Sequence, residues 1–280
     1  MKFESVMILL TLIAPILGGL AFGAERIVRA RMQSRIGPPL MQPFYDFFKL
    51  MDKRPLMVHS LHAVMGIMYF VACWFALVVL FLGNDLLVAV FFHVIAVLAL
   101  TIGAFSVRSP YSVIGAMREL MHMISYEPLM VLMVVGFYEV VGSFNLKDIL
   151  TYQGIPILQM PVIFVSFVLA IPMMLHKSPF DVAEAHQEII GGVEIEYSGP
   201  FYEAVYTGKW IEYVYVFFFV FLFAGSHYLL GLGLVLAVFI FINALDNATA
   251  RLDFRRMVKF SWFMLIPLSA LNIIFLALWR

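Results

Sequence analysis

Two apolar runs decide the fold. Residues 61–82 read LHAVMGIMYFVACWFALVVLFL, residues 86–106 read LLVAVFFHVIAVLALTIGAFS, and only GND at 83–85 separates them. Neither run contains Asp, Glu, Lys or Arg. Because a helix of about twenty apolar residues crosses the hydrocarbon core of a bilayer, the pair predicts two membrane-spanning helices joined by a short turn.

The composition extends this prediction to the whole chain. Hydrophobic residues make up 63% of the 280 and charged residues 13%, whereas soluble domains carry about 25% charged residues. The net charge of zero also argues against a nucleic-acid partner bound by bulk electrostatics. We therefore expect an all-α polytopic membrane protein that forms one integral membrane domain over residues 1–280 and is covered by lipid.

Apolar runs near twenty residues predict about eight spans. They cover residues 4–24, 61–82, 86–106, 119–141, 158–176, 211–228, 229–246 and 260–279. The run at 211–246 is too long for one ordinary span, and Gly225-Ser226-His227 supplies turn residues that divide it. Seven spans, with one long helix at 211–246, is the alternative.

Basic residues set the expected orientation. The loop after the first span holds Arg26, Arg29, Arg31, Arg35, Lys49, Lys53 and Arg54. The positive-inside rule then places the loops 25–60, 107–118, 177–210 and 247–259 in the cytoplasm and both termini outside. Only eight spans place all the basic loops on the same side of the membrane. With seven spans, the basic loop 247–259 would lie on the outside.

The third cytoplasmic loop is acidic. A helix is expected to start at Pro179, so that Asp181, Glu184 and Glu188 lie on one face at i, i+3 and i+7. Like charges at this spacing repel, which predicts a raised pKa for at least one carboxyl, as a proton relay requires. A hydrated loop that docks on a basic partner is the alternative.

Charged residues also occur within the span at 119–141. Glu119, His122 and Tyr126 share one helical face, and Glu127 follows about nine residues into the span. A charge at the centre of a membrane helix costs roughly 2.5–3.5 kcal/mol, so such residues usually face a polar interior. The side chain of Glu119, near the helix end, can reach the polar membrane surface. Glu127 lies too far inside the span for this explanation.

The first cytoplasmic loop contains a proline cluster that forbids a continuous helix from the first span. From Phe44 its aromatic residues predict an amphipathic helix in the membrane interface. Arg35 and Lys53 flank it and are candidates for pairing with lipid phosphates or a docked subunit.

Cofactor ligands are scarce in the sequence. Cys73 is the single cysteine, whereas an iron–sulfur cluster needs about four ligands. His59 and His62 stand three apart without nearby partner ligands. No cofactor, metal site or catalytic centre of its own is expected in this chain.

Together these segments resemble the subunit 1 family of respiratory complex I, the heel-like membrane subunit that joins the peripheral arm to the antiporter-like subunits. The matching stretches are residues 24–26, 33–50, Ser125-Tyr126-Glu127, 179–184, Gln187-Glu188, Glu196-Tyr197-Ser198-Gly199 and Arg255-Arg256.

Two departures indicate a branch of that family. Pro38 leads through Pro39-Leu40-Met41 directly to Gln42-Pro43, a shorter loop than in quinone-reducing members, and His186 stands where respiratory members commonly have an acid. Both features look like the energy-converting membrane-bound hydrogenase and formate hydrogenlyase branch. The resemblance then implies a nickel–iron centre and iron–sulfur clusters in cytoplasmic partners, namely hydrogenase-like large and small subunits and a ferredoxin-like subunit. Antiporter-like subunits are the implied membrane partners, in a prokaryotic plasma membrane.

The resemblance also implies an acidic pathway that couples electron transfer in the docked module to movement of H⁺ or Na⁺. The family's pattern carries over to Glu127, Asp181, Glu184, Glu188 and Glu196. Spacing adds Glu194, Glu119, His122 and Tyr126. His186, at the position where respiratory members commonly have an acid, is a further proton-carrying candidate because the pKa of a free imidazole lies near neutral. The candidate docking or gating charges are Arg35, Lys53 and Arg118. A quinone-binding subunit of an NADH-, deazaflavin- or ferredoxin-dependent oxidoreductase, the same subunit of a sulfur-reducing relative, a stand-alone ion transporter and a passive anchor are the alternatives.

Overall fold

The computed structural model describes residues 3–83 and 85–279, and these residues form helices and no strand. Asn84, in the predicted turn at 83–85, lies outside the described residues. The long helices are α1 (Phe3–Met32), α3 (Ser60–Phe81), α4 (Leu86–Phe105), α5 (Pro110–Val141), α8 (Pro161–Met174), α10 (Pro200–Leu222) and α11 (Tyr228–Ala248). At the C-terminal end α12 (Phe254–Phe260) continues through a π turn, Ser261–Leu265, into α13 (Ile266–Trp279). The short helices are α2 (Gln42–Met51), α6 (Leu146–Thr151), α7 (Pro156–Gln159) and α9 (His186–Ile189), and a 3₁₀ turn covers Gly192–Glu194.

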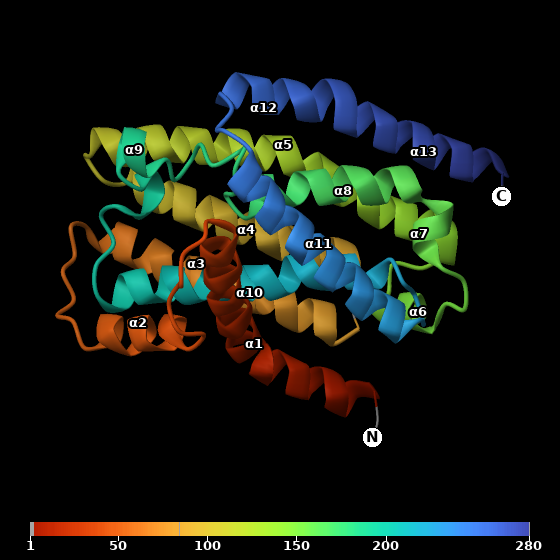
Figure 1. Ribbon diagram of the computed structural model, residues 1–280, viewed down its shortest axis with the longest axis horizontal. Coiled ribbons are helices and arrows are strands. Elements are labelled where there is room, and N and C mark those ends of the chain that lie inside the picture. Colours follow the sequence, from red (N-terminus) through yellow and green to blue (C-terminus); the bar gives the residue numbers. More distant parts are fainter. Residues whose placement is uncertain (1–2, 84, 280) are drawn as a thin grey trace.

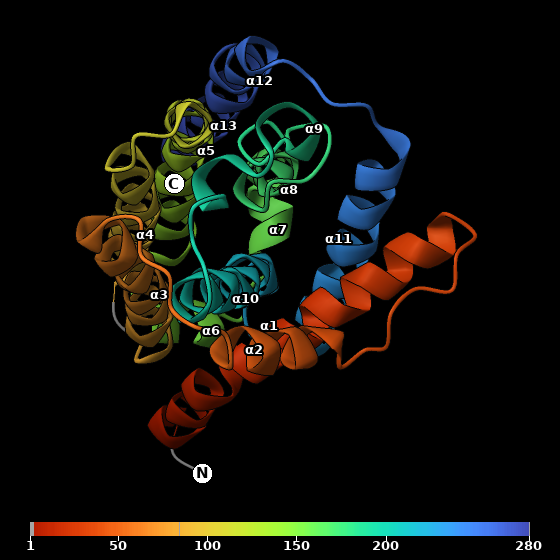
Figure 2. The same ribbon diagram turned by 90° about the vertical axis from the view of Figure 1, so that its left-hand side faces the viewer.

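The helices run mainly along the long axis of the molecule (Figure 1). In that view α1 crosses the others steeply and α11 crosses them diagonally. Figure 2 shows α3, α4 and α5 on one side of the bundle and α11 on the other, with α10 between them. The helix α10 packs against both α3 and α1, so it is the central element of the fold.

Seven of the described helices are long and apolar enough to cross a membrane. The eighth apolar helix, α8, has 14 residues and rises only about 21 Å, which is shorter than the expected span at 158–176. The shortening follows from Pro161, which starts α8 anew after α7. The long run at 211–246 is divided as the turn residues predicted: α10 ends at Leu222, α11 begins at Tyr228, and Gly225 between them has a φ of +60°.

Several helices extend beyond the predicted spans. The helix α1 continues to Met32, α5 begins at Pro110 and α10 begins at Pro200, so the loops between these helices are shorter than expected. Hydropathy missed these ends because they carry charged residues. Several of those charges pair inside the protein, as Lys209 of α10 does with Glu184, and so belong to helices.

The predicted amphipathic helix is α2, which packs beneath α10. The rings of Phe44 and Phe47 lie 5.4 and 6.2 Å from the Trp210 ring of α10, while Phe48 is 68% exposed. The helices α1 and α10 approach closely at a glycine. A Cβ placed on Gly18 would lie 2.1 Å from the carbonyl oxygen of Trp210.

Candidate functional site

Three groups of buried charged residues lie around α10. The lysine cluster consists of Lys209, Glu184, Glu194, His176 and Glu119. The histidine cluster consists of His93, Glu127, Glu212 and Tyr69. The α1 cluster consists of Glu25, Arg29, Lys177, Tyr213 and Asp246. Because α10 supplies Lys209, Glu212 and Tyr213, one helix contributes to all three.

In the lysine cluster a buried ammonium lies between two carboxylates. Lys209 Nζ is 2.5 Å from Glu184 Oε1 and also pairs with Glu194. His176 continues the line, with Nδ1 3.3 Å from Glu184 Oε1 and Nε2 2.8 Å from Glu119 Oε2. Positive and negative groups therefore alternate from Glu194 to Glu119.

These contacts give neighbouring acidic groups different pKa values. Burial disfavours the charged form of Glu184, but Lys209 and His176 outweigh it and lower its pKa to about 2. Burial raises the pKa of Glu194 above its ordinary value, against the opposing effect of Lys209. Burial would lower the pKa of His176, but Glu119 and Glu184 raise it to about 10. One acid of this cluster is thus held ionised while its neighbour takes up a proton more readily.

The histidine cluster lies inside the bundle, between α3, α4, α5 and α10. His93 is 1% exposed, and its Nδ1 lies 3.2 Å from Glu127 Oε1. Its Nε2 lies 2.9 Å from Glu212 Oε1, and the Tyr69 hydroxyl donates to Glu212 Oε2 at 3.1 Å. The His93 ring stacks on Tyr215, with centroids 5.0 Å apart and planes 7° from parallel.

The α1 cluster joins α1 to the loop after α8 and to α11. Glu25 is 4% exposed, accepts a bond from Arg29 at 2.7 Å, and also pairs with Lys177 and Tyr213. Arg29 reaches Asp246 of α11 at 2.6 Å. Each charge in this cluster therefore has an opposite charge in contact with it.

The predicted helix with three stacked carboxylates is wrong. Residues 177–185 form turns and irregular backbone, and Glu184 pairs with Lys209 and His176, away from the partners of the other two acids. Asp181 pairs with Arg251 at 2.8 Å, and Glu188 pairs with Arg118 at 2.7 Å and with the same Arg251 at 3.4 Å. A hydrogen bond from Arg118 lowers the pKa of Glu188, and Glu184 has a lowered pKa too, so the expected raised value falls on Glu194 instead. The attraction of cations distant in the sequence for these acids outweighs local helix formation here.

The remaining predicted residues divide into buried and exposed ones. His122 and Tyr126 are 0% and 1% exposed on the predicted face of α5, and His122 Nδ1 lies 2.9 Å from the carbonyl oxygen of Met173. The His122 ring is 5.2 Å from that of His176, beside the lysine cluster. Glu196 is half-buried and lies outside the three clusters. The exposed residues, which lie outside the three clusters, are His186, Arg35 and Lys53.

Sequence reasoning missed several members of the clusters. His93 was visible as a histidine in the middle of the apolar run 86–106, a signal that could have been used. Lys209 and Glu212 were placed in or next to a loop because their charge lowers the local hydropathy. His176, Lys177 and Glu25 gave no periodic signal, since their partners are distant in the sequence.

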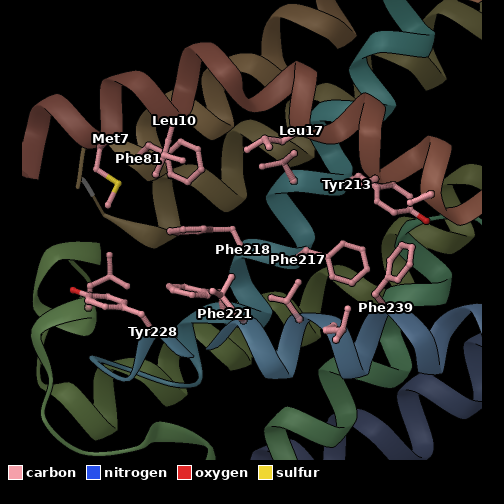
Figure 3. A pocket seen from close by; sticks show the side chains of 17 residues that line it. Met7, Leu10, Leu17, Phe81, Tyr213, Phe217, Phe218, Phe221, Tyr228 and Phe239 are labelled. Carbon is pink, nitrogen blue, oxygen red and sulfur yellow. The ribbon is translucent and has the colours of Figure 1, made fainter. Parts of the chain in front are cut away.

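A cavity of about 1020 Å³ lies between α1, α10 and α11 (Figure 3). Its lining is almost wholly apolar and includes Leu10, Leu17, Phe217, Phe221 and Phe239. Tyr213 lies at one end and Tyr228 at the other, and Tyr213 is the member of the α1 cluster that lines it. Within residues 3–83 and 85–279, no group of three His, Cys, Asp or Glu residues is arranged to hold a metal ion.

Comparison with known proteins gives a consistent match along the chain. The profile of the family described as NADH dehydrogenase matches residues 4–277. One relative, from Geobacillus kaustophilus, is the NADH-quinone oxidoreductase component designated H, and it is 31% identical over 95% of this chain and 91% of that protein. The corresponding component from Brevibacillus brevis is 31% identical over 95% and 90%.

A solved structure is similar in both length and fold. A chain of the membrane-bound sulfane sulfur reductase, an archaeal respiratory membrane complex, superposes with a TM-score of 0.88 at 25% identity. The match covers 99% of this chain and 100% of that one. By contrast, the alignment to the Geobacillus protein runs over 306 positions, more than the 280 residues present here, so that protein contains segments absent from this chain.

Proposed function

This chain belongs to the NADH dehydrogenase family, and we propose that it couples electron transfer in a docked redox module to ion movement in neighbouring membrane subunits. It is a membrane-embedded subunit related to those of complex I. In the proposed mechanism the electrons stay in the partner subunits. Protons redistribute along the lysine and histidine clusters, to which α5 contributes Glu119 and Glu127.

The arrangement of buried acids and bases carries this proposal. Glu119, Glu194 and Glu212 are 2%, 9% and 6% exposed, in a chain whose outer surface faces lipid. Burying an ionisable group is costly, and membrane proteins with buried pairs mostly use them as ion or proton paths. A passive anchor would need none of these groups.

The docked module is proposed to be of the hydrogenase or sulfur-reducing type. Two observations support this branch: the sulfane sulfur reductase chain matches this one over nearly its whole length, and the quinone oxidoreductase relative contains extra segments. The proposed partners are hydrogenase-like large and small subunits, which hold the nickel–iron or related centre, and an iron–sulfur ferredoxin-like subunit. Antiporter-like subunits complete the membrane part, with both termini of this chain outside the cell.

The loops around α2 are the proposed docking face. Ile36 and Leu56 are 81% and 68% exposed there, beside the exposed cations Arg35 and Lys53. Exposed apolar residues surrounded by positive charge are typical of a surface that a partner covers. Arg118 lies apart from this face because it pairs with Glu188 and donates to the Val182 carbonyl oxygen.

Quinone reduction is the second candidate function. The relatives from Geobacillus and Brevibacillus are NADH-quinone oxidoreductase components, and the cavity between α1, α10 and α11 is apolar enough for a hydrocarbon tail. Purifying the native complex separates the two: nickel with iron–sulfur proteins supports the hydrogenase type, iron without nickel and without quinone supports the sulfur-reducing type, and extracted quinone supports the second candidate.

The coupling role is tested with Glu127→Gln in the assembled complex. We expect electron transfer to continue in the presence of an uncoupler, while ion-gradient formation in inverted vesicles falls by about 100-fold, as for loss of a proton-transfer group. Asp148→Asn, an exposed acid on α6 outside the clusters, is the matched control. A full gradient in Glu127→Gln vesicles would show that the proposed coupling is wrong.

A further inference from the structure

We propose that His93 relays protons between Glu127 of α5 and Glu212 of α10. This inference rests on the proposed coupling function and adds a residue and a direction to it. It is based on one buried imidazole whose two ring nitrogens are hydrogen-bonded to different carboxylates, at 3.2 and 2.9 Å.

The placement of His93 makes it a bridge between two helices. It lies on α4, which Figure 2 shows between α3 and α5, and α10 packs against α3. Glu127 and Glu212 each meet the imidazole separately, at opposite nitrogens of the ring. A proton moving from one carboxyl to the other along these hydrogen bonds therefore passes through the ring.

The proton balance follows from imidazole chemistry. A neutral ring has one N–H, so it donates to one carboxylate and accepts at its other nitrogen. When a protonated Glu127 gives its proton to Nδ1 and Nε2–H passes its own to Glu212, one O–H and one N–H bond break while one N–H and one O–H bond form. The ring then carries its proton on Nδ1, and ring rotation or a return transfer restores the first tautomer before the next proton.

The two carboxylates are held differently, which gives the relay an entry and an exit. Both oxygens of Glu212 are bonded, one to His93 and one to the Tyr69 hydroxyl. Glu127 Oε1 meets His93, but its Oε2 is buried without a hydrogen-bond partner among the described residues. The Glu127 oxygen without a partner can accept a proton from outside the cluster, whereas Glu212 is the carboxyl that receives it from His93.

Stacking on Tyr215 supports a relay and also a purely structural clamp. Parallel packing at 5.0 Å keeps the ring plane aligned with both acids. A clamp requires only that the side chain fill this space and hydrogen-bond to both acids, whereas a relay requires the ring to gain and lose protons. The test must therefore separate hydrogen bonding from proton exchange.

His93→Gln makes that separation, because an amide can donate and accept but does not exchange protons near neutral pH. We expect the assembled complex to keep its uncoupled electron transfer and to lose about 100-fold in the rate of gradient formation. Thr101→Val is the matched control: Thr101 is a buried polar residue of the same helix, and its hydroxyl bonds only the Val97 carbonyl oxygen among the described residues, at 2.8 Å. It should keep both activities.

Comparison with Glu127→Gln distinguishes the two proposals. If Glu127→Gln abolishes the gradient and His93→Gln keeps it, the relay is overturned and the coupling function stands. If both variants keep the gradient, both proposals are overturned. If both lose it while Thr101→Val does not, both are supported.

A second measurement serves if His93→Gln does not assemble. Redox-difference infrared spectra of the complex with ¹⁵N-labelled histidine should contain an imidazole band that changes in both Glu127→Gln and Glu212→Gln. His93 is the described histidine that contacts both acids, so such a band supports the relay. Spectra in which no imidazole band responds to both variants overturn it.

Discussion

Lys209→Met removes the buried cation that lies between Glu184 and Glu194. Methionine keeps most of the aliphatic volume but cannot pair with either acid. Lys209 is 17% exposed and lies 2.5 Å from Glu184. Its loss therefore leaves the buried carboxylates of Glu184 and Glu194 without the ammonium group that contacts both. Removing one partner of a buried ion pair costs about 3–5 kcal/mol.

The lowered pKa of Glu184 gives a figure of similar size, to which His176 and Lys177 contribute together with Lys209. A carboxyl lowered from 4.5 to about 2 contributes roughly 3 kcal/mol at neutral pH, since each pKa unit is 1.36 kcal/mol. For a chain of this size that corresponds to a fall of about 5–10 °C in the melting midpoint.

The pH dependence has a defined sign. The pKa of Glu184 is lowered in the folded protein, so its stabilisation is complete above 4.5 and is lost as pH falls toward about 2. In Lys209→Met, burial raises the pKa of Glu194 further, and its protonation relieves the unpaired charge as pH falls. The difference between the native protein and the variant should therefore be largest near pH 8 and shrink toward pH 5.

The assay is the melting midpoint of the purified chain in detergent at a fixed heating rate, followed by tryptophan fluorescence from pH 5 to 8. The double variant Lys209→Met/Glu194→Gln is the control, because removing the unpaired acid should recover part of the loss. An unchanged midpoint, or a loss of equal size at pH 5 and pH 8 that Glu194→Gln does not relieve, would refute this reasoning.

Two further changes probe the periphery and the packing. Arg251→Ala breaks the pairs with Asp181 at 2.8 Å and Glu188 at 3.4 Å; because Glu188 is 48% exposed, the loss should stay below about 1 kcal/mol by the same melting assay. The pKa of Glu188 should rise toward its ordinary value, which carboxyl NMR would detect, and a melting loss as large as that of Lys209→Met would contradict this ranking. Gly18→Ala places a Cβ 2.1 Å from the Trp210 carbonyl oxygen, so α1 and α10 must separate at a cost of about 1–3 kcal/mol. Gly233→Ala on α11, where no described atom lies within 4 Å of the new Cβ, should be neutral or slightly stabilising; equal losses in the two glycine variants would show that helix contact is not the cause.

The sequence predicted the fold class because membrane spans depend on a local property, the apolar content of about twenty consecutive residues. The same local reasoning found the break at Gly225, the amphipathic helix α2 and the buried face of Glu119, His122 and Tyr126, since each rests on spacing within one element. It failed where charge and helix coincide, as at the start of α10.

The composition of the charged clusters was decided by the tertiary structure alone. His93 meets partners 34 and 119 residues away, and Glu25 bonds Tyr213 across 188 residues. Asp181, Glu184 and Glu188 look like one group in the sequence, but Glu184 pairs with Lys209 of α10, whereas Arg251 after α11 pairs with both Asp181 and Glu188. Hydropathy and helical periodicity predict which segments form helices in lipid and which residues share one helical face. Which acid meets which base depends on how the helices pack, and the energy of a buried charge depends on that pairing.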